Sequence, residues 1–266
     1  MGNVPRLFVT SDIARDGFVA LDEGQAKYLS RVMRLKKGDA VRVFNGRDGE
    51  WRSEIDMIEG RSVLVKARER LKDQAATMPL TLLFAPLKKT RTDFVVEKAT
   101  EMGVARIIPV MTDYTQASRV REDRLEKIAL EAAEQTERMD IPRVDRAQSL
   151  FAAIADLEDH TTVLFCDEAG DDALRAWGGD SGRAAPMVDV LTRLGHGAGA
   201  ILVGPEGGFS PAEREHLRAL PHVEPVTLGP RILRAETAVV AALALWQAIR
   251  GDWTGTLPDP AEDKTP

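Results

Sequence analysis

The sequence is poor in cysteine and histidine and has no long hydrophobic run. A single cysteine, Cys166, excludes an internal disulfide, and no group of cysteines and histidines has the spacing of a zinc site. The longest apolar run, residues 238–246, covers nine residues, far fewer than the roughly 20 that a membrane-spanning helix needs. The amino terminus lacks the apolar stretch of a signal peptide. We therefore expect a cytoplasmic protein that has no membrane span and no metal.

Charge is distributed unevenly along the 266 residues, whose formal net charge is −6. Residues 1–72 hold 15 Lys and Arg against 11 Asp and Glu, a net charge of +4, whereas residues 73–266 hold 21 against 31, a net charge of −10. Positive potential favours contact with nucleic acid phosphates. The same side chains would equally serve to solvate a small β domain, so charge alone leaves both interpretations open.

Short β-like segments dominate the first 70 residues. Apolar residues recur at strand-like spacing near 7–9, 18–21, 41–43, 51–58 and 63–65, with turns at Asn45-Gly46 and Asp48-Gly49. Residues 22–33 between them have a helical pattern and carry Lys27, Arg31 and Arg34. The pattern predicts a small β-barrel with one helix that presents a basic face.

A polar stretch at residues 69–79 separates this region from one with a different pattern. Apolar strands at 80–85, 107–111, 163–166, 201–203 and 223–228 alternate with helical segments at 92–102, 123–138, 184–194, 211–219 and 235–250. Such alternation predicts an α/β domain with a largely parallel sheet. We expect domains at residues 1–72 and 73–251, followed by a disordered tail at 252–266.

The most informative segment is the glycine-rich stretch 204–208, which follows the strand at 201–203. Ser210 has the character of a helix N-cap, Pro211 suits the first helical position, and Glu213 completes a capping box. Glycine lets a ligand approach the backbone at the carboxyl end of a parallel strand. An ordinary tight turn is the alternative. The spacing matches neither a Walker loop nor a dinucleotide-binding fingerprint.

Two further segments could contribute to a site. Residues 228–238 again join a strand to a helix and add Arg231, Arg234 and Glu236. The helix that follows is apolar nearly all round, which fits either a central core helix or a subunit interface. Residues 87–103 place cations after a strand, where they could contact phosphate.

These segments together resemble the family that methylates N3 of a uridine in 16S ribosomal RNA, a member of the knotted SPOUT class. The resemblance rests on Pro5-Arg6-Leu7-Phe8-Val9, Leu29-Ser30-Arg31-Val32-Met33-Arg34-Leu35, Glu97-Lys98-Ala99-Thr100-Glu101-Met102-Gly103, Gly204-Pro205-Glu206-Gly207-Gly208-Phe209-Ser210 and Leu228-Gly229-Pro230-Arg231-Ile232-Leu233-Arg234-Ala235-Glu236-Thr237-Ala238. The order and spacing of these motifs, which span nearly the whole chain, make it specific.

The resemblance implies an N-terminal PUA-like β-barrel that holds RNA, followed by a SPOUT domain with a trefoil knot. It also implies a homodimer that acts on 16S rRNA in the 30S subunit and binds S-adenosylmethionine (SAM) among three loops. The implied cofactor-binding residues are Met111, Thr112, Leu202, Val203, Gly204, Glu206, Gly207, Gly208, Leu228, Gly229, Ile232, Leu233 and Arg234. The implied RNA-binding residues are Arg6, Arg31, Arg34, Lys88 and Arg91.

The chain departs from the family pattern at three places. Tyr28 stands where histidine is common, and Asp113-Tyr114-Thr115 replaces the usual Glu-Arg-Ser. Glu137 replaces a glycine in the signature that here reads Glu134-Gln135-Thr136-Glu137-Arg138. The cofactor loops show no comparable departure.

Methylation at N3 of uracil requires loss of the N3 proton, so the site should stabilise the uridine anion or remove that proton. Arg234 is our candidate for the first role. Arg138 is a second candidate that could instead bind phosphate or a partner subunit. Glu236 is the candidate base, although a carboxylate at a helix start could equally serve the helix dipole.

Two other functions remain open from the sequence. A SPOUT enzyme that modifies tRNA or another rRNA base would share the cofactor loops. A non-catalytic RNA-binding or ribosome-assembly factor would keep the glycine segments only as turns, and failure to bind SAM would favour it.

Overall fold

A computed structural model describes residues 4–75, 77–117, 119–172, 174–175, 179, 181–194 and 198–254. Contacts divide the chain into two units: Met1–Thr77 with Lys127–Ile141, and Met78–Glu126 with Pro142–Pro266. The domains expected at 1–72 and 73–251 differ from these units mainly in residues 127–141. Within the described ranges, no helix combines the length and apolar character needed to cross a bilayer, and no cluster of His, Cys, Asp and Glu could hold a metal ion.

The first unit contains a five-stranded mixed sheet. Its strands lie in the order β1-β3-β4-β5-β2, in which β1 is parallel to β3 and the other neighbours are antiparallel. The core contains buried aliphatic side chains that alternate along the strands, such as Val41, Val43 and Val65. The bounds are β1 (Arg6–Phe8), β2 (Phe18–Ala20), β3 (Ala40–Phe44), β4 (Glu50–Glu59) and β5 (Ser62–Lys72). All five strands coincide with segments predicted from the alternation.

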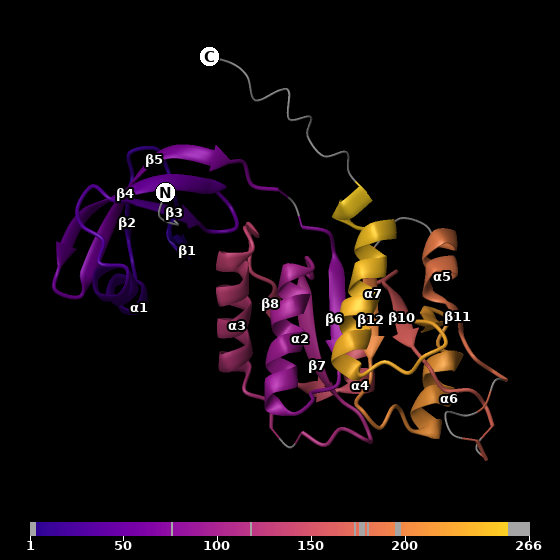
Figure 1. Cartoon of the computed structure of the whole chain (residues 1–266). Coiled ribbons are helices and arrows are strands. Elements are labelled where there is room, and N and C mark those ends of the chain that lie inside the picture. Colours follow the sequence, from indigo (N-terminus) through magenta and orange to yellow (C-terminus); the bar gives the residue numbers. More distant parts are fainter. Residues whose placement is uncertain are drawn as a thin grey trace. The chain divides into compact units, whose positions relative to one another are not determined.

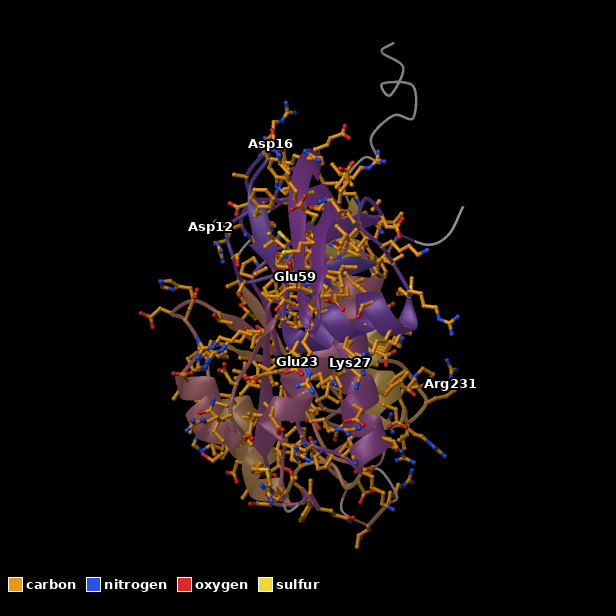
Figure 2. All side chains as sticks on the ribbon, turned by 90° about the vertical axis from the view of Figure 1, so that its left-hand side faces the viewer. Asp12, Asp16, Glu23, Lys27, Glu59 and Arg231 are labelled. Carbon is orange, nitrogen blue, oxygen red and sulfur yellow. The ribbon has the colours of Figure 1, made fainter. Side chains whose placement is uncertain are left out.

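The helix predicted at residues 22–33 forms in two parts. Asp22 and Gln25 make a capping box at the start of α1 (Glu23–Lys27), and the chain continues as the π-helix η1 (Tyr28–Val32). Arg34, with a φ of 57°, takes the left-handed conformation just beyond it. Figure 2 shows the Lys27 side chain on this helix, and Arg31 and Arg34 are likewise exposed.

The second unit is built on a parallel sheet (Figure 1). The strand order is β11-β13-β10-β12-β6-β7-β8, with β9 beside β7, and every neighbouring pair is parallel. The bounds are β6 (Leu80–Phe84), β7 (Arg106–Met111), β8 (Arg143–Val144), β9 (Gln148–Ser149), β10 (Thr162–Cys166), β11 (Ala185–Pro186), β12 (Gly199–Val203) and β13 (Val223–Thr227). The predicted α/β architecture is thereby confirmed.

The helices follow the predicted pattern, with two short additions, α4 and η3. They are α2 (Lys89–Glu101), α3 (Glu122–Gln135), α4 (Leu150–Ala155), α5 (Met187–Arg193), α6 (Pro211–Ala219), α7 (Ala235–Ile249) and the short 3-10 helix η3 (Asp252–Thr254). Helix α4, at six residues, and strands β8, β9 and β11, at two residues each, are too short for a periodic pattern to reveal. Of the tail expected at 252–266, residues 255–266 lie outside the described part.

Helix α7 packs on one face of the sheet, between α2 and α5 (Figure 1). Its buried side includes Val239, Leu243 and Trp246. Gly199 of β12 lies under the indole, and a Cβ at that position would meet Trp246 Cη2 at 1.9 Å. Residues 240, 241, 244 and 245 of the same helix are only partly buried. The helix is therefore a core element on one side and leaves an apolar strip half-exposed on the other.

The opposite face of the sheet is covered by α4 and α6. Leu150 and Ile154 of α4 and Leu217 of α6 join a buried cluster with strand residues that include Phe165 and Leu202. Because side chains alternate along a strand, Ala200 and Leu202 face this cluster while Gly199 faces α7. Both faces are therefore covered, as parallel sheets require.

Candidate cofactor and acceptor site

A cavity of about 370 Å³ opens at the carboxyl ends of β10 and β12 and at the start of α7. It is lined by residues 166–169, 203–209, 214, 232–235 and 238. Strands β12, β10 and β13 are neighbours in the sheet, and the carboxyl ends of neighbouring parallel strands meet at one edge. The cavity thus gathers the segments that follow three adjacent strands. We call it the cofactor cavity.

The glycine segment 204–208 is fixed at its far end by the helix that follows. Ser210 and Glu213 form the predicted capping box at the start of α6. Ser210 Oγ also donates to Asp113 Oδ2 at 2.5 Å, and the Asp113 N–H donates to Glu213 Oε1 at 2.9 Å. The segment after β7 therefore braces the glycine segment through Asp113, one of the positions where the sequence departs from the family pattern.

Gly204 makes room for a side chain of its own loop. A Cβ at Gly204 would lie 2.5 Å from the Phe209 ring, and that ring packs edge-on against Phe165 with centroids 4.9 Å apart. Gly208, with a φ of 70°, has open space where its Cβ would be. A Cβ at Gly207 would lie 3.4 Å from Tyr114 Cβ. All three glycines line the cavity, and Gly204 is the one whose missing side chain makes room for a ring.

The segment after β10 was not predicted as part of the site. Asp167 is buried and receives hydrogen bonds from Arg214 Nε at 2.9 Å and Arg218 Nε at 2.9 Å, both from α6. Arg214 Nη2 also donates to the Ala169 carbonyl at 2.8 Å. The available signal was an acidic segment directly after a predicted strand. Recognising this segment as part of the site requires knowledge of the strand order, which places β10 between β12 and β13.

Glu168 places a carboxyl group in the cavity wall with one oxygen unsatisfied. Its Oε1 is buried and has no hydrogen-bond partner. Burial is the main reason that the pKa of Glu168 is raised, with the nearby charge of Arg183 opposing and that of Asp167 adding to the effect. Burial also raises the pKa of the Cys166 thiol to about 12. Because the thiolate is the reactive form, Cys166 is a packing residue in this wall.

The cavity contains eight of the predicted cofactor-binding residues: Val203, Gly204, Glu206, Gly207, Gly208, Ile232, Leu233 and Arg234. It does not include the other five: Met111, Thr112, Leu202, Leu228 and Gly229. Leu202 points into the buried cluster beneath the sheet. The β7 segment braces the glycine segment instead of lining the cavity.

Arg91, predicted to bind RNA, connects two acidic residues of the site. Its Nη1 lies 3.2 Å from Glu206 Oε1, and its Nε lies 3.4 Å from Glu236 Oε1. The second oxygen of Glu236 is buried without a hydrogen-bond partner. Within the described residues no backbone N–H donates to this second oxygen, although the carboxylate stands in the first turn of α7, where the helix dipole favours it. Glu236 therefore has one oxygen beside Arg91 and one that is buried without a partner, and the residue stands next to the lining residues Arg234 and Ala235 without lining the cofactor cavity itself.

The arginines of the 228–234 segment are exposed. Arg234 stands at the N-cap of α7 and lines the cofactor cavity. Figure 2 shows Arg231 extending away from the ribbon, and its side chain does not line that cavity. Arg234 is thus the arginine of this segment that lines the cofactor cavity.

Arg6 and Arg138 belong to the first unit and are engaged there. Arg6 is 6% exposed, pairs with Glu50 at 2.7 Å, and donates to the carbonyls of Ala133 and Arg138, each at 2.7 Å. This placement speaks against the predicted RNA contact, because the guanidinium is buried and its donors are used. Arg138 pairs with Asp140 at 2.7 Å, which likewise weakens its candidacy as a second uracil-binding arginine.

Glu137 occupies the position where the family pattern has glycine and keeps a glycine-like backbone. Its φ is 60°, in the left-handed region that costs other residues about 1 kcal/mol. Lys72 Nζ lies 2.6 Å and Arg42 Nη1 lies 3.1 Å from its carboxylate oxygens. These two contacts lower the pKa of Glu137 to about 2. The departure is therefore accommodated by ion pairs within the first unit.

Family models of known proteins match residues in both units of the chain. Residues 74–247 match the family model of an RNA methyltransferase domain, and residues 21–67 match that of an RNA methyltransferase PUA domain. The chain is 30% identical over 240 residues to ribosomal RNA small subunit methyltransferase E of Rickettsia conorii, covering 90% of this chain and 93% of that protein. It is 29% identical over 243 residues to the Bacillus subtilis protein of the same name, covering 86% and 90%.

Solved structures agree with these matches. The crystal structure of ribosomal RNA small subunit methyltransferase E from Neisseria gonorrhoeae, bound to S-adenosyl methionine, has a TM-score of 0.82 and 26% identity, covering 95% of this chain and all of that one. A probable rRNA-methyltransferase from Porphyromonas gingivalis has a TM-score of 0.74 and 27% identity, covering 93% and 98%. The likeness extends through both units.

Proposed function

The chain belongs to the RNA methyltransferase domain family, and on this premise we propose that it transfers a methyl group from SAM to N3 of a uridine in 16S rRNA. The observation that carries this proposal is the cofactor cavity, formed after three adjacent parallel strands in a chain that matches a SAM-bound relative along nearly its whole length. In this reaction SAM supplies a methyl group that is already activated on a sulfonium.

The residues of the cofactor cavity suit such a ligand. Its volume of about 370 Å³ lies within the range of roughly 300–1,000 Å³ found for small-molecule sites. Ala235, Ala238 and Ile232 supply apolar wall, and Gly207 and Gly208 supply accessible backbone. The unsatisfied Oε1 of Glu168 would accept a hydrogen bond from an amino or hydroxyl group of the cofactor. A buried acceptor without a partner is costly, so ligand binding would remove this cost.

The acceptor chemistry falls to Arg234 and Glu236. Arg234 at the mouth of α7 would donate to a uracil oxygen and stabilise the anion that forms when N3 loses its proton. Glu236 would accept that proton on the oxygen that has no hydrogen-bond partner, while Arg91 orients the other. The chain itself therefore contributes charge stabilisation, a proton acceptor and a fixed geometry.

The relatives and helix α7 support further proposals about the substrate particle, the location and the oligomeric state of the protein. The relatives named for the small-subunit rRNA favour the 30S particle as substrate, in the cytoplasm. The exposed Arg31 and Arg34 of the PUA-matching region are candidates for phosphate contact. The half-exposed apolar strip of α7 favours a homodimer. We also propose a trefoil knot in the second domain and domain ranges of 1–72 and 73–251.

The direct test is methyl transfer to 30S subunits assembled from unmodified 16S rRNA. We expect about one methyl group from labelled SAM per subunit, and reverse transcription that stops at a single uridine because N3 methylation blocks Watson–Crick pairing. Transfer to tRNA or to another base would instead identify a different SPOUT activity. Absence of both transfer and SAM binding would favour the RNA-binding or assembly factor.

A further inference from the structure

A second cavity, of about 480 Å³, lies where the chain leaves β6 and enters α2. It extends from Leu87 and Lys88 on one side to residues 116, 117, 119–121, 124 and 125 on the other, all within the second unit. Nothing in the proposed methyl transfer uses it. We call it the basic cavity because five of its lining residues are cationic and two are acidic: Lys88, Lys89, Arg119, Arg121, Arg124, Asp93 and Glu206.

Ion pairing leaves part of this positive charge uncompensated. Arg124 is paired with Asp93 at 2.5 Å, and Arg121 is paired with Asp123 at 2.6 Å. Glu206, the other acidic lining residue, is paired with Arg91. By contrast, Lys88, Lys89 and Arg119 are exposed and form no ion pair within the part of the chain that the structure describes. Three cations at one opening favour an anionic ligand.

The interior of the basic cavity is apolar. Leu87 is 6% and Leu125 is 2% exposed, and Pro86, Ala117 and Val120 complete this surface. An inorganic anion alone would not require such a wall. A planar nucleobase would use it, because bases bind apolar and aromatic surfaces through their faces. The combination of an apolar interior with cations at the opening therefore fits a nucleotide better than a free phosphate.

The basic cavity adjoins the cofactor cavity. Glu206 lines both of them, and Arg91 holds this residue from α2. A nucleotide in the basic cavity would consequently lie next to the site where the methyl donor binds. That position suits an RNA that must be held beside its modified base, because phosphate contacts fix the position of a nucleic acid while other contacts specify it.

We propose that the basic cavity binds one nucleotide of the RNA substrate, with its phosphate on Lys88, Lys89 and Arg119 and its base against Leu87 and Leu125. This inference rests on the proposed function for the identity of the RNA. It places Lys88, already an expected RNA contact, in a defined subsite of the second unit, and adds Lys89, Arg119 and an apolar base-binding wall to it.

The test is the binding of labelled, unmodified 30S subunits to the full-length protein in the presence of S-adenosylhomocysteine. In Lys88→Gln/Lys89→Gln/Arg119→Gln we expect the Kd for 30S subunits to rise about tenfold or more, with a shallower salt dependence. The Kd for SAM should stay within about twofold, since none of the three residues lines the cofactor cavity. The matched control is Arg193→Gln, an exposed arginine that lines neither cavity.

A second variant separates a bound nucleotide from phosphate held only at the opening. Ala117→Trp fills the apolar interior and leaves the three cations in place, so it should also weaken 30S binding. Unchanged 30S binding in Ala117→Trp would overturn the nucleotide assignment, and unchanged binding in the triple variant would overturn the site. Because binding is read without methyl transfer, a wild-type protein that binds 30S subunits but does not methylate them refutes the proposed function and not this subsite.

Discussion

Arg91 and Glu236 form an ion pair in which Arg91 Nε lies 3.4 Å from Glu236 Oε1. The same guanidinium reaches Glu206 Oε1 at 3.2 Å through Nη1. One side chain at the start of α2 thereby connects the glycine segment with the first turn of α7. This arrangement gives Glu236 one oxygen held by Arg91 and a second, unpartnered one, to which the proposed mechanism assigns the N3 proton.

Arg91→Ala should lower kcat by about tenfold to a hundredfold, because the orientation of Glu236 is lost. The Kd for SAM should change less than about threefold, since Arg91 is not among the residues that line the cofactor cavity. Methyl transfer kinetics and SAM calorimetry measure the two quantities. Arg91→Lys should recover only part of kcat, because one ammonium cannot reproduce a planar group with two contacts. Full activity of Arg91→Ala would refute this role.

Arg234→Ala should suppress turnover much more than SAM binding. The side chain is exposed and stands at the N-cap of α7 without a capping bond, so its loss should leave the melting temperature nearly unchanged. Its proposed role is to stabilise the uridine anion, an interaction made in the transition state. Single-turnover rates on 30S subunits provide the measurement. Equal rates in Arg234→Ala and wild type would remove Arg234 from the mechanism.

Glu168→Gln tests the unsatisfied carboxyl group in the cavity. Because burial raises the pKa of Glu168, the folded state keeps its proton to higher pH than the unfolded state does. The contribution of this group to stability is therefore fully present below the unfolded pKa and is lost as pH rises toward the raised folded value. The variant should be more stable than wild type at neutral pH, by about 1 kcal/mol, and should bind SAM more weakly. Urea unfolding and calorimetry test both effects.

Glu137→Gln tests the ion pairs of Glu137, the residue that stands where the family pattern has glycine. Lys72 and Arg42 lower the pKa of Glu137 to about 2, so their stabilisation is present above the usual value of 4.5 and is lost as pH falls through about 2. The carboxylate is half-exposed, which limits the effect to about 1 kcal/mol at pH 7. The stability difference should shrink as pH falls from about 4.5 to about 2. Glu137→Gly should lie closer to wild type, because it relieves a left-handed φ.

Local sequence signals predicted the elements well. The capping box of Ser210 and Glu213 fixed the start of α6 at the predicted residue, and the alternation of apolar residues located β3, β4 and β5. Eight cofactor-cavity residues followed from the family motifs. The capping box and the strands depend on residues close together in the chain, where spacing carries the information, whereas the eight cavity residues were implied by the family resemblance.

Features that depend on distant pairings were missed. The segment after β10 enters the cavity because β10 lies between β12 and β13, an order that periodicity does not encode. Arg6 is buried because Glu50, 44 positions away, accepts its hydrogen bond, and nothing beside Arg6 in the sequence indicates this partner. The contact of Arg91 with Glu206 spans 115 positions in the same way. Charged residues are therefore the ones whose roles the sequence predicted least reliably.

The central claim is that the segments after β10, β12 and β13 form a SAM site, and calorimetric titration with SAM tests it most directly. Gly207→Trp should abolish binding, because Gly207 lines the cavity and a Cβ there would already lie 3.4 Å from Tyr114 Cβ, so an indole must either enter the cavity or displace the glycine segment. Glu215→Trp, on an exposed face of α6, is the matched control and should bind like wild type. Saturable SAM binding that is lost only in Gly207→Trp is the predicted result. No binding by the wild-type protein, or equal binding by Gly207→Trp, would contradict the assignment of this cavity.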